Sequence, residues 1–328
     1  MWAQFVTTLT QVASVSGVSL VVNGTGLDLP DTPGQVSTLT SLGYQSQDAG
    51  SVETAILRTG SELSRVSSDR PLEQDQPMPP KMPASAVLPN IPPWWIDLGL
   101  SWNGQEIAAI SADHSELARW QWDRHTQLAT FGSDLTRPSY DSTNGLWVAG
   151  EARGEARIWV IDTSQTSMEK AIPRVIPVPW LANRTVLALK VATDNQRVAL
   201  ITSNRSGADV QVVVAGITRS ASGAPLALAA EPLRVGWTLS AATDLTWVDD
   251  STLAVVGRVS PKDVMGPQLV EIGGKITPMP PVAGARLVTN TGGLRGVVVL
   301  TDQGKVLARA GRGWQVLQTG TDFLIPGE

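Results

Sequence analysis

The sequence predicts an all-β fold built from many short strands, and three observations support this class. Gly and Pro contribute 30 and 22 of the 328 residues, whereas 17% of the residues are charged and 42% are hydrophobic. A chain this apolar and this rich in turn-forming residues favours short strands over disorder. From Asp97 onward, helical periodicity largely gives way to alternating apolar segments. Finally, these segments recur along the chain with a similar internal plan.

The recurring unit is an apolar strand, a turn, a second strand rich in small apolar residues, and a further strand-like stretch. Five such units follow one another, and their turn residues are separated by 41, 51, 55 and 43 positions: Asn103, Asn144, Asn195, Asp250 and Gly293. Repeats of this length with about four short strands are typical of β-propeller blades. A small twisted sheet buries neither face alone, so we expect the blades to stack radially into a ring.

A sixth blade is predicted before the five repeats. Val52–Val66 has an apolar strand, a Thr-Gly turn and a second strand, and it resembles Val297–Ala310 in this plan. It has no obvious first strand of the repeat type, although Val36–Tyr44 could supply one. The C-terminal segment Thr321–Pro326 is left over, and we predict that it pairs with Val52–Val66. This pairing closes the ring and protects the strand edges. We therefore expect six blades, with five or seven as alternatives because the spacings are irregular.

Two domains are predicted. Residues 1–43 contain a short amphipathic helix, the strand Val18–Val22 and an Asn-Gly turn, which cannot bury enough apolar surface to fold alone. We interpret them as the C-terminal remnant and linker of an α/β domain, the alternative being a decoration packed on the main body. Residues 44–328 form the propeller. Within it, residues 69–93 hold eight prolines and are predicted to be an inter-blade strap, with a docking motif as the alternative.

The composition excludes several classes of function. The formal net charge of −5 does not favour binding to nucleic acid or anionic lipid. The longest apolar runs, including Val210–Ile217, have strand length and fall short of the ~20 residues that span a bilayer. The first basic residue is Arg58, so no secretory signal is predicted at the start of the chain. Any export or anchoring signal is therefore expected upstream of Met1.

The two histidines do not indicate catalysis or metal binding. His114 lies beside Asp113 in a predicted solvated loop, and the chain has no Gly-x-Ser-x-Gly nucleophile elbow. His125 follows a strand pattern and is predicted to be a turn residue. A zinc site needs three or four ligands, and the chain has no Cys. We assign no catalytic residue and no metal ligand, and we expect no cofactor.

One segment is similar to a turn found in other propellers. Ser139–Trp147 resembles the Asp-box of sialidase-like propellers, although two more residues separate its Asp from its Gly. A sialidase would also need an arginine cluster and a Tyr nucleophile, and neither Tyr44 nor Tyr140 lies in a recognisable setting. We predict a structural hairpin turn in which Trp147 packs between blades.

Tryptophan supplies 12 of the 17 aromatic residues. Most fall within strand patterns, where a wide side chain fills the gap between stacked sheets; these are Trp102, Trp147, Trp159, Trp237 and Trp247. Two pairs fit this role less well. Trp94 and Trp95 lie at the end of the proline-rich strap. Trp120 and Trp122 lie two residues apart, on one face of a strand, and are flanked by arginines. Because Trp and Arg are enriched at interface hot spots, we predict partner binding at Trp94, Trp95, Trp120, Trp122, Arg119 and Arg124.

The helix at Trp2–Gln11, the strand and turn at Val18–Gly24, and a propeller ending in Leu324–Gly327 together resemble the lipoprotein LpqB family of actinobacteria. The resemblance implies a lipidated Cys, a GerMN domain and a β-propeller, in that order. The chain is similar to the tail of the GerMN domain plus the whole propeller. It lacks the lipidated Cys and most of GerMN, so it is expected to be part of a longer protein.

The same resemblance implies a non-enzymatic accessory lipoprotein held on the outer face of the cell membrane by an upstream lipid anchor. It implies two partners: the extracytoplasmic domain of an MtrB-like sensor histidine kinase, which controls envelope and division genes, and the missing GerMN part of the same protein. The alternative function is a cell-wall propeller that binds or hydrolyses glycans. That function would require a central pocket with convergent carboxylates and stacked aromatic side chains.

Overall fold

The computed structural model divides the chain into two compact units, Met1–Gly50 and Ser51–Glu328. It describes residues 21–22, 25–26, 54–67, 88–121, 124–128, 131–164 and 171–327. In the first unit, the described residues form a two-stranded antiparallel hairpin, β1 (Val21–Val22) with β2 (Thr25–Gly26). The predicted helix at Trp2–Gln11 and most of the predicted strap lie outside the described residues.

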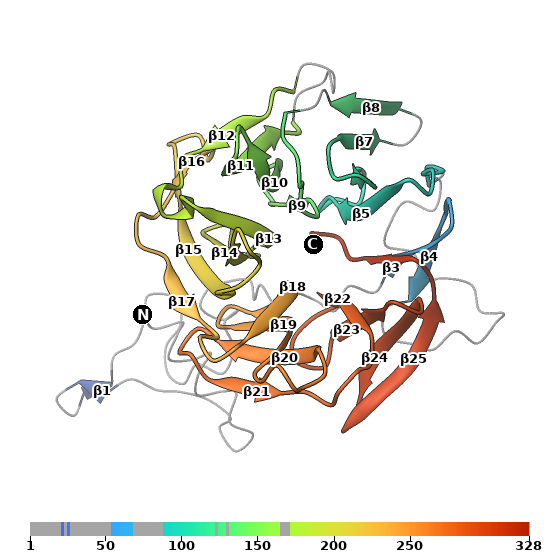
Figure 1. Cartoon of the computed structure of the whole chain (residues 1–328), viewed down its shortest axis with the longest axis vertical. Coiled ribbons are helices and arrows are strands. Elements are labelled where there is room, and N and C mark those ends of the chain that lie inside the picture. Colours follow the sequence, from blue (N-terminus) through green and yellow to red (C-terminus); the bar gives the residue numbers. More distant parts are fainter. Residues whose placement is uncertain are drawn as a thin grey trace. The chain divides into compact units, whose positions relative to one another are not determined.

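The second unit is a six-bladed β-propeller, which confirms the predicted fold class and blade number (Figure 1). Its sheets are antiparallel, and the strands of each are given from the innermost outward. Blade 1 comprises β26 (Asp322–Leu324), β3 (Thr54–Thr59) and β4 (Glu62–Ser67). Blade 2 comprises β5 (Trp95–Leu100), β6 (Ile107–Ser111), β7 (Leu117–Gln121) and β8 (Arg124–Leu128). Blade 3 comprises β9 (Ser139–Tyr140), β10 (Gly145–Ala152), β11 (Glu155–Asp162) and β12 (Arg174–Ile176).

The 3₁₀ helix η3 (Pro179–Leu181) leads into blade 4. That blade comprises β13 (Arg184–Val191), β14 (Arg197–Asn204) and β15 (Gln211–Arg219), with β16 (Pro225–Leu228) and β17 (Leu233–Val235) both paired to β15. Blade 5 comprises β18 (Ala241–Asp249), β19 (Thr252–Arg258), β20 (Gly266–Glu271) and β21 (Ile276–Pro278). Blade 6 comprises β22 (Ala285–Asn290), β23 (Val297–Thr301), β24 (Lys305–Ala310) and β25 (Gly313–Thr319).

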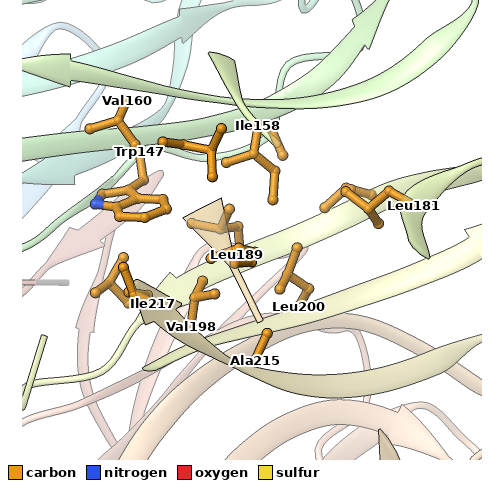
Figure 2. Close-up of a cluster of buried hydrophobic side chains, with 14 of the residues drawn as sticks. Trp147, Ile158, Val160, Leu181, Leu189, Val198, Leu200, Ala215 and Ile217 are labelled. Atoms are coloured by element: carbon orange, nitrogen blue, oxygen red, sulfur yellow. The ribbon is translucent and has the colours of Figure 1, made fainter. Parts of the chain in front are cut away.

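The hydrophobic core lies between blades. Each pair of neighbouring blades shares a cluster of buried apolar side chains, six clusters in the described part of the chain. Figure 2 shows the cluster between blades 3 and 4, where Trp147 and Ile158 face Leu189 and Leu200. Since both faces of a blade are covered, second strands such as β19 and β23 read as continuous apolar runs and are almost wholly buried.

The C-terminal strand closes the ring, as predicted. β26 pairs with β3, so a segment at the end of the chain becomes the innermost strand of blade 1. Asp322 links this strand to two further blades: one carboxylate oxygen accepts the Leu98 amide at 3.1 Å, and the other accepts Arg137 Nη2 at 2.8 Å. Arg58, opposite Asp322 in β3, donates to the backbone of Trp95. Closure therefore combines strand pairing with buried polar contacts.

The tryptophans divide into two groups. Trp147, Trp159 and Trp247 are buried between blades, as predicted. For Trp102 and Trp237 the prediction was wrong, because both lie in loops beyond the strand ends and are 37% and 67% exposed.

Among the described residues, no helix has the length and apolar character needed to cross a membrane.

Candidate functional site

A pocket of about 570 Å³ lies on blade 2, beside the turn of blade 1. We call it the tryptophan pocket. It is formed by β7, β8, the ends of β5 and β6, and the segment that precedes β5. Its lining residues are Pro89, Asn90, Pro92, Trp94, Trp95, Ser111, Glu116, Trp120, Arg124, His125 and Gln127. Its volume falls within the range of small-ligand and anchor-residue pockets.

Aromatic side chains form one wall of the tryptophan pocket. Trp120 on β7 pairs directly with His125 on β8, and their rings stack with centroids 4.8 Å apart. Trp95, at the start of β5, meets Trp120 edge to face at 5.5 Å, an arrangement that aromatic rings favour. Trp95 and Trp120 are almost fully buried, whereas Trp94 beside them is 63% exposed. The pocket thus has a rigid buried wall and one indole presented to solvent.

Polar side chains surround this wall. Gln127 Nε2 donates to Glu116 Oε2 at 2.6 Å, and Arg124 Nη2 donates to Gln121 Oε1 at 2.6 Å. Asn90 Nδ2 donates to Ser61 Oγ of blade 1 at 3.4 Å. An apolar aromatic centre with a polar, partly charged rim is the usual anatomy of a protein–protein interface.

The structure brings four of the six predicted site residues together in this pocket: Trp94, Trp95, Trp120 and Arg124. Trp122 lies outside the described residues. His125, predicted to be a turn residue, instead belongs to strand β8, and sequence reasoning also missed Glu116. The signal for His125 is its register, because only two residues separate Gln121 from Arg124 and these two pair, which places His125 opposite Trp120.

Arg119 lies elsewhere because it occupies the opposite face of β7. It is buried, and its guanidinium forms two hydrogen bonds of 2.8 Å with the carboxylate of Glu106. Tyr140 from blade 3 donates its hydroxyl to the same carboxylate at 2.9 Å. Burial raises the pKa of Tyr140, and the neighbouring Glu106 carboxylate raises it further. Arg119 therefore belongs to a structural network between blades 2 and 3.

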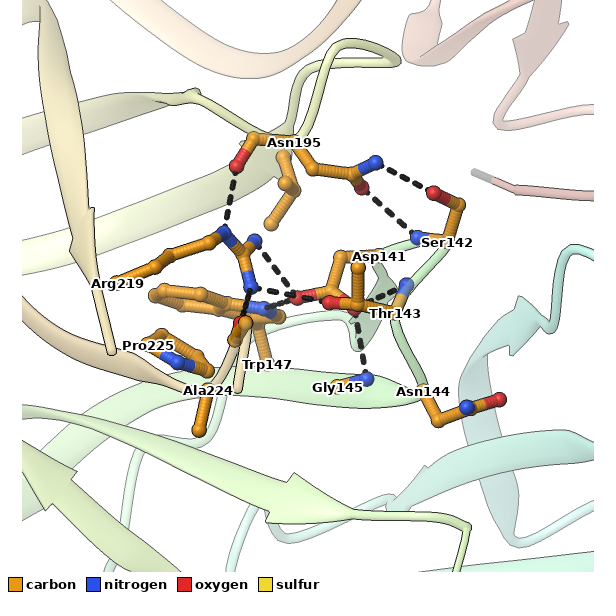
Figure 3. Close-up of polar contacts among 12 residues, drawn as sticks. Asp141, Ser142, Thr143, Asn144, Gly145, Trp147, Asn195, Arg219, Ala224 and Pro225 are labelled. Atoms are coloured by element: carbon orange, nitrogen blue, oxygen red, sulfur yellow. Dashed lines mark hydrogen bonds and ion pairs between the residues drawn. The ribbon is translucent and has the colours of Figure 1, made fainter. Parts of the chain in front are cut away.

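The Asp-box-like segment forms the predicted structural turn (Figure 3). Oδ1 of the buried Asp141 accepts the Thr143 and Gly145 amides at 2.9 and 2.7 Å, which fixes the hairpin. Oδ2 accepts Trp147 Nε1 at 2.9 Å and Arg219 Nη2 of blade 4 at 3.0 Å. Both oxygens of the Asp141 carboxylate are therefore occupied by structural hydrogen bonds. Trp147 packs between blades 3 and 4, as predicted.

A second cavity, of about 360 Å³, lies where the innermost strands begin, and we call it the central cavity. Three carboxylates line it, those of Asp97, Asp134 and Asp244, but none of the described lining residues is a tryptophan, tyrosine or phenylalanine. The aromatic platform that a glycan-processing site requires is therefore missing from this lining. His114 also lines the cavity and is half-buried, with Nδ1 2.8 Å from the Leu135 carbonyl oxygen, rather than solvated as predicted.

We expect the stability of the propeller to depend on pH because of the Asp244 carboxyl group. Desolvation raises the pKa of this carboxyl above its ordinary value of 3.8, outweighing the opposite effects of Arg137, the Val288 amide and Lys190. The stability gained by protonating Asp244 is complete below pH 3.8 and is lost as the pH rises through the raised pKa. We therefore expect Asp244→Asn to melt at a higher temperature than the wild type at neutral pH.

Thermal melts between about pH 4 and pH 7.5 measure this effect. The difference between Asp244→Asn and the wild type should shrink toward the acid end, where the wild-type carboxyl becomes protonated. Asp250→Asn is the matched control, since the Asp250 side chain is 86% exposed on the same blade. A difference for Asp244→Asn that does not change with pH would contradict the prediction.

These features define the class of protein: a six-bladed β-propeller with an aromatic pocket on one blade and a charged central cavity. Residues 96–326 match the family described as the lipoprotein LpqB β-propeller domain, and the chain belongs to that family. Lipoprotein LpqB of Streptomyces avermitilis is 26% identical over 209 residues, which cover 62% of this chain and 33% of that protein. The match thus spans about a third of the relative's length.

The fold is also similar to that of a solved propeller. The crystal structure of TolB from Acinetobacter baumannii aligns with a TM-score of 0.53 at 14% identity, covering 83% of this chain and 65% of that one. At this identity the likeness concerns the fold alone. The family match and the curated relative confirm the resemblance predicted from the sequence.

Proposed function

We propose that this propeller is the extracytoplasmic, non-enzymatic binding part of a membrane-anchored lipoprotein. Its partner is the external region of an MtrB-like sensor histidine kinase, whose two-component system controls the envelope and division. Membership of the LpqB propeller family and the lipoprotein relative support the class and the location. The GerMN part of the longer protein is a second partner within the same polypeptide.

The observation that carries this proposal is the tryptophan pocket with its exposed Trp94. An indole that is 63% exposed beside an aromatic wall offers a partner a large apolar surface. Interface hot spots are enriched in Trp and Arg and concentrate in such pockets. Arg124, exposed on the rim, supplies a cation for an acidic group of the partner. The propeller acts by presenting this surface rigidly.

Replacing Trp94 tests the surface. We expect Trp94→Ala to weaken binding of the purified kinase sensor region about 30-fold, because a hot-spot truncation costs about 2 kcal/mol and each 1.4 kcal/mol is a factor of about ten. Biolayer interferometry on the full chain measures the dissociation constant. The matched control is Trp237→Ala, because Trp237 is similarly exposed, at 67%, but lies in the loop between blades 4 and 5.

The outcomes separate the candidate functions. Unchanged binding in Trp94→Ala, or equal weakening in both variants, would remove the tryptophan pocket as the interface. Saturable binding of a soluble cell-wall glycan that depends on Trp94, without binding of the sensor region, would instead favour the glycan-binding function.

A further inference from the structure

The central cavity is a second site, independent of the tryptophan pocket. Five blades contribute to its wall, through the innermost strands β5, β13, β18 and β22, the turn between β6 and β7, and the loop before β9. Ionisable groups converge there from positions far apart in sequence: Asp97, His114, Asp134, Arg137, Lys190, Asp244 and Arg286. Its volume of about 360 Å³ lies at the lower end of the range for ligand sites. None of these side chains was predicted to bind a partner.

The central cavity is lined by charges of both signs. Three cationic side chains, Arg137, Lys190 and Arg286, and three carboxylates, those of Asp97, Asp134 and Asp244, line it together. A simple anion would lie near three carboxylates, and a simple cation near three cationic groups, at a cost in either case. A ligand that carries both charges avoids this repulsion, because each of its ends meets the opposite sign.

Arg137 retains hydrogen-bonding capacity. Its Nη2 donates to Asp322 at 2.8 Å, which orients the guanidinium at the cavity wall. Its Nη1 is buried and has no acceptor within the described part of the chain. Buried donors are normally paired, and a guanidinium commonly binds a carboxylate through two nitrogens. This unfilled capacity favours a ligand that supplies oxygen atoms.

The backbone around the cavity is also unusual. Asp97, His114 and Asp134 adopt left-handed conformations, with φ of 50°, 55° and 49°. Asp and His tolerate this region better than most residues, but such positions are uncommon and concentrate at functional sites. All three side chains line the central cavity. The fold therefore holds these groups at the cavity with backbone conformations that the surrounding structure must enforce.

The remaining wall is aliphatic. Leu187 of β13 is 38% exposed at this wall, and Leu135, Leu189 and Leu287 line it with little exposure of their own. A cavity with paired opposite charges and an aliphatic wall matches the free end of a peptide, which has a terminal charge, amide groups and side chains. We propose that the central cavity binds a short peptide with free ends, its carboxylate facing the arginines and its ammonium group facing the aspartates.

Isothermal titration calorimetry with the tripeptide Ala-Leu-Ala tests this site on the full chain. We expect saturable binding that weakens at least tenfold when the peptide is C-terminally amidated, and again when it is N-acetylated. Arg286→Gln should reduce binding of the free peptide by a similar factor. Arg286 is exposed, and its guanidinium also donates to the Thr321 carbonyl, a surface contact whose loss should leave the fold intact. Arg295→Gln is the matched control, because Arg295 is an exposed arginine in the turn that follows β22.

A second variant pair tests the acidic side. Asp134→Asn should weaken binding of free Ala-Leu-Ala but not that of its acetylated form, whereas Asp250→Asn should affect neither. The proposal is overturned if the free peptide shows no saturable binding, if blocking both ends leaves the affinity unchanged, or if the control variants weaken binding equally. Because the probe is not the kinase and Trp94 is untouched, these outcomes are independent of the proposed function.

Discussion

Replacing Phe323 with Ala is expected to lower the free energy of unfolding by about 3–5 kcal/mol, the usual cost of removing a buried phenylalanine ring. Phe323 is 1% exposed and lies on β26, the strand that closes the ring. It packs in the cluster shared by blade 1 and blade 6, near Leu57 and Leu300. The total stability of a domain is about 5–15 kcal/mol, so this single change removes a large part of it.

Chemical denaturation with urea, followed by tryptophan fluorescence, measures the loss. Val316→Ala is the control, since Val316 is 49% exposed on β25, the outermost strand of blade 6, and its truncation should cost well under about 1 kcal/mol. An equal loss in the two variants would mean that β26 contributes nothing special to closure.

The closing strand was predictable because each of the two segments that pair can be recognised from its own short sequence. Five repeats account for the chain from residue 100 onward, and Val52–Val66 lacks an innermost strand of the repeat type. The unassigned Thr321–Pro326 supplies a short apolar strand at the other end. A ring needs every edge paired, so the two incomplete pieces belong together. The register, with Asp322 opposite Arg58 and Leu324 opposite Ile56, was set by contacts that the sequence does not reveal.

Exposure of individual tryptophans was less predictable. Alternation along β7 correctly places Arg119 and Trp120 on opposite faces, but in a propeller both faces of a blade are covered by neighbours. Both residues are therefore buried, one against Glu106 and the other against Trp95. Period-two patterning tells inside from outside only where one face meets water. Trp94 is exposed because it precedes the first strand of blade 2.

The central cavity could not be predicted from the sequence at all. Asp97 lies within β5, His114 in the turn after β6 and Arg137 just before β9, and none belongs to a recognisable motif. They meet because the closed ring brings the innermost strands of different blades together at its centre. Sites assembled from several blades carry no signal in local spacing.

The second large effect is expected at Asp141. Asp141→Ala removes the acceptor for two turn amides, for the Trp147 indole and for Arg219. Arg219 is left partly buried without its carboxylate, and breaking a buried ion pair in this way costs about 3–5 kcal/mol. Because the carboxylate joins blade 3 to blade 4, we expect the loss to appear in the global unfolding transition measured with urea.

Two further variants identify which contacts matter. Asp250→Ala should cost less than about 1 kcal/mol, since that turn carboxylate is 86% exposed and lies 3.9 Å from Arg197. Asp141→Asn keeps an oxygen for the turn amides but loses the charge opposite Arg219, so its loss should fall between those of the two alanine variants. If Asp141→Asn is as stable as the wild type, the turn hydrogen bonds alone account for the effect. If Asp141→Ala is no worse than Asp250→Ala, the carboxylate does not join the blades.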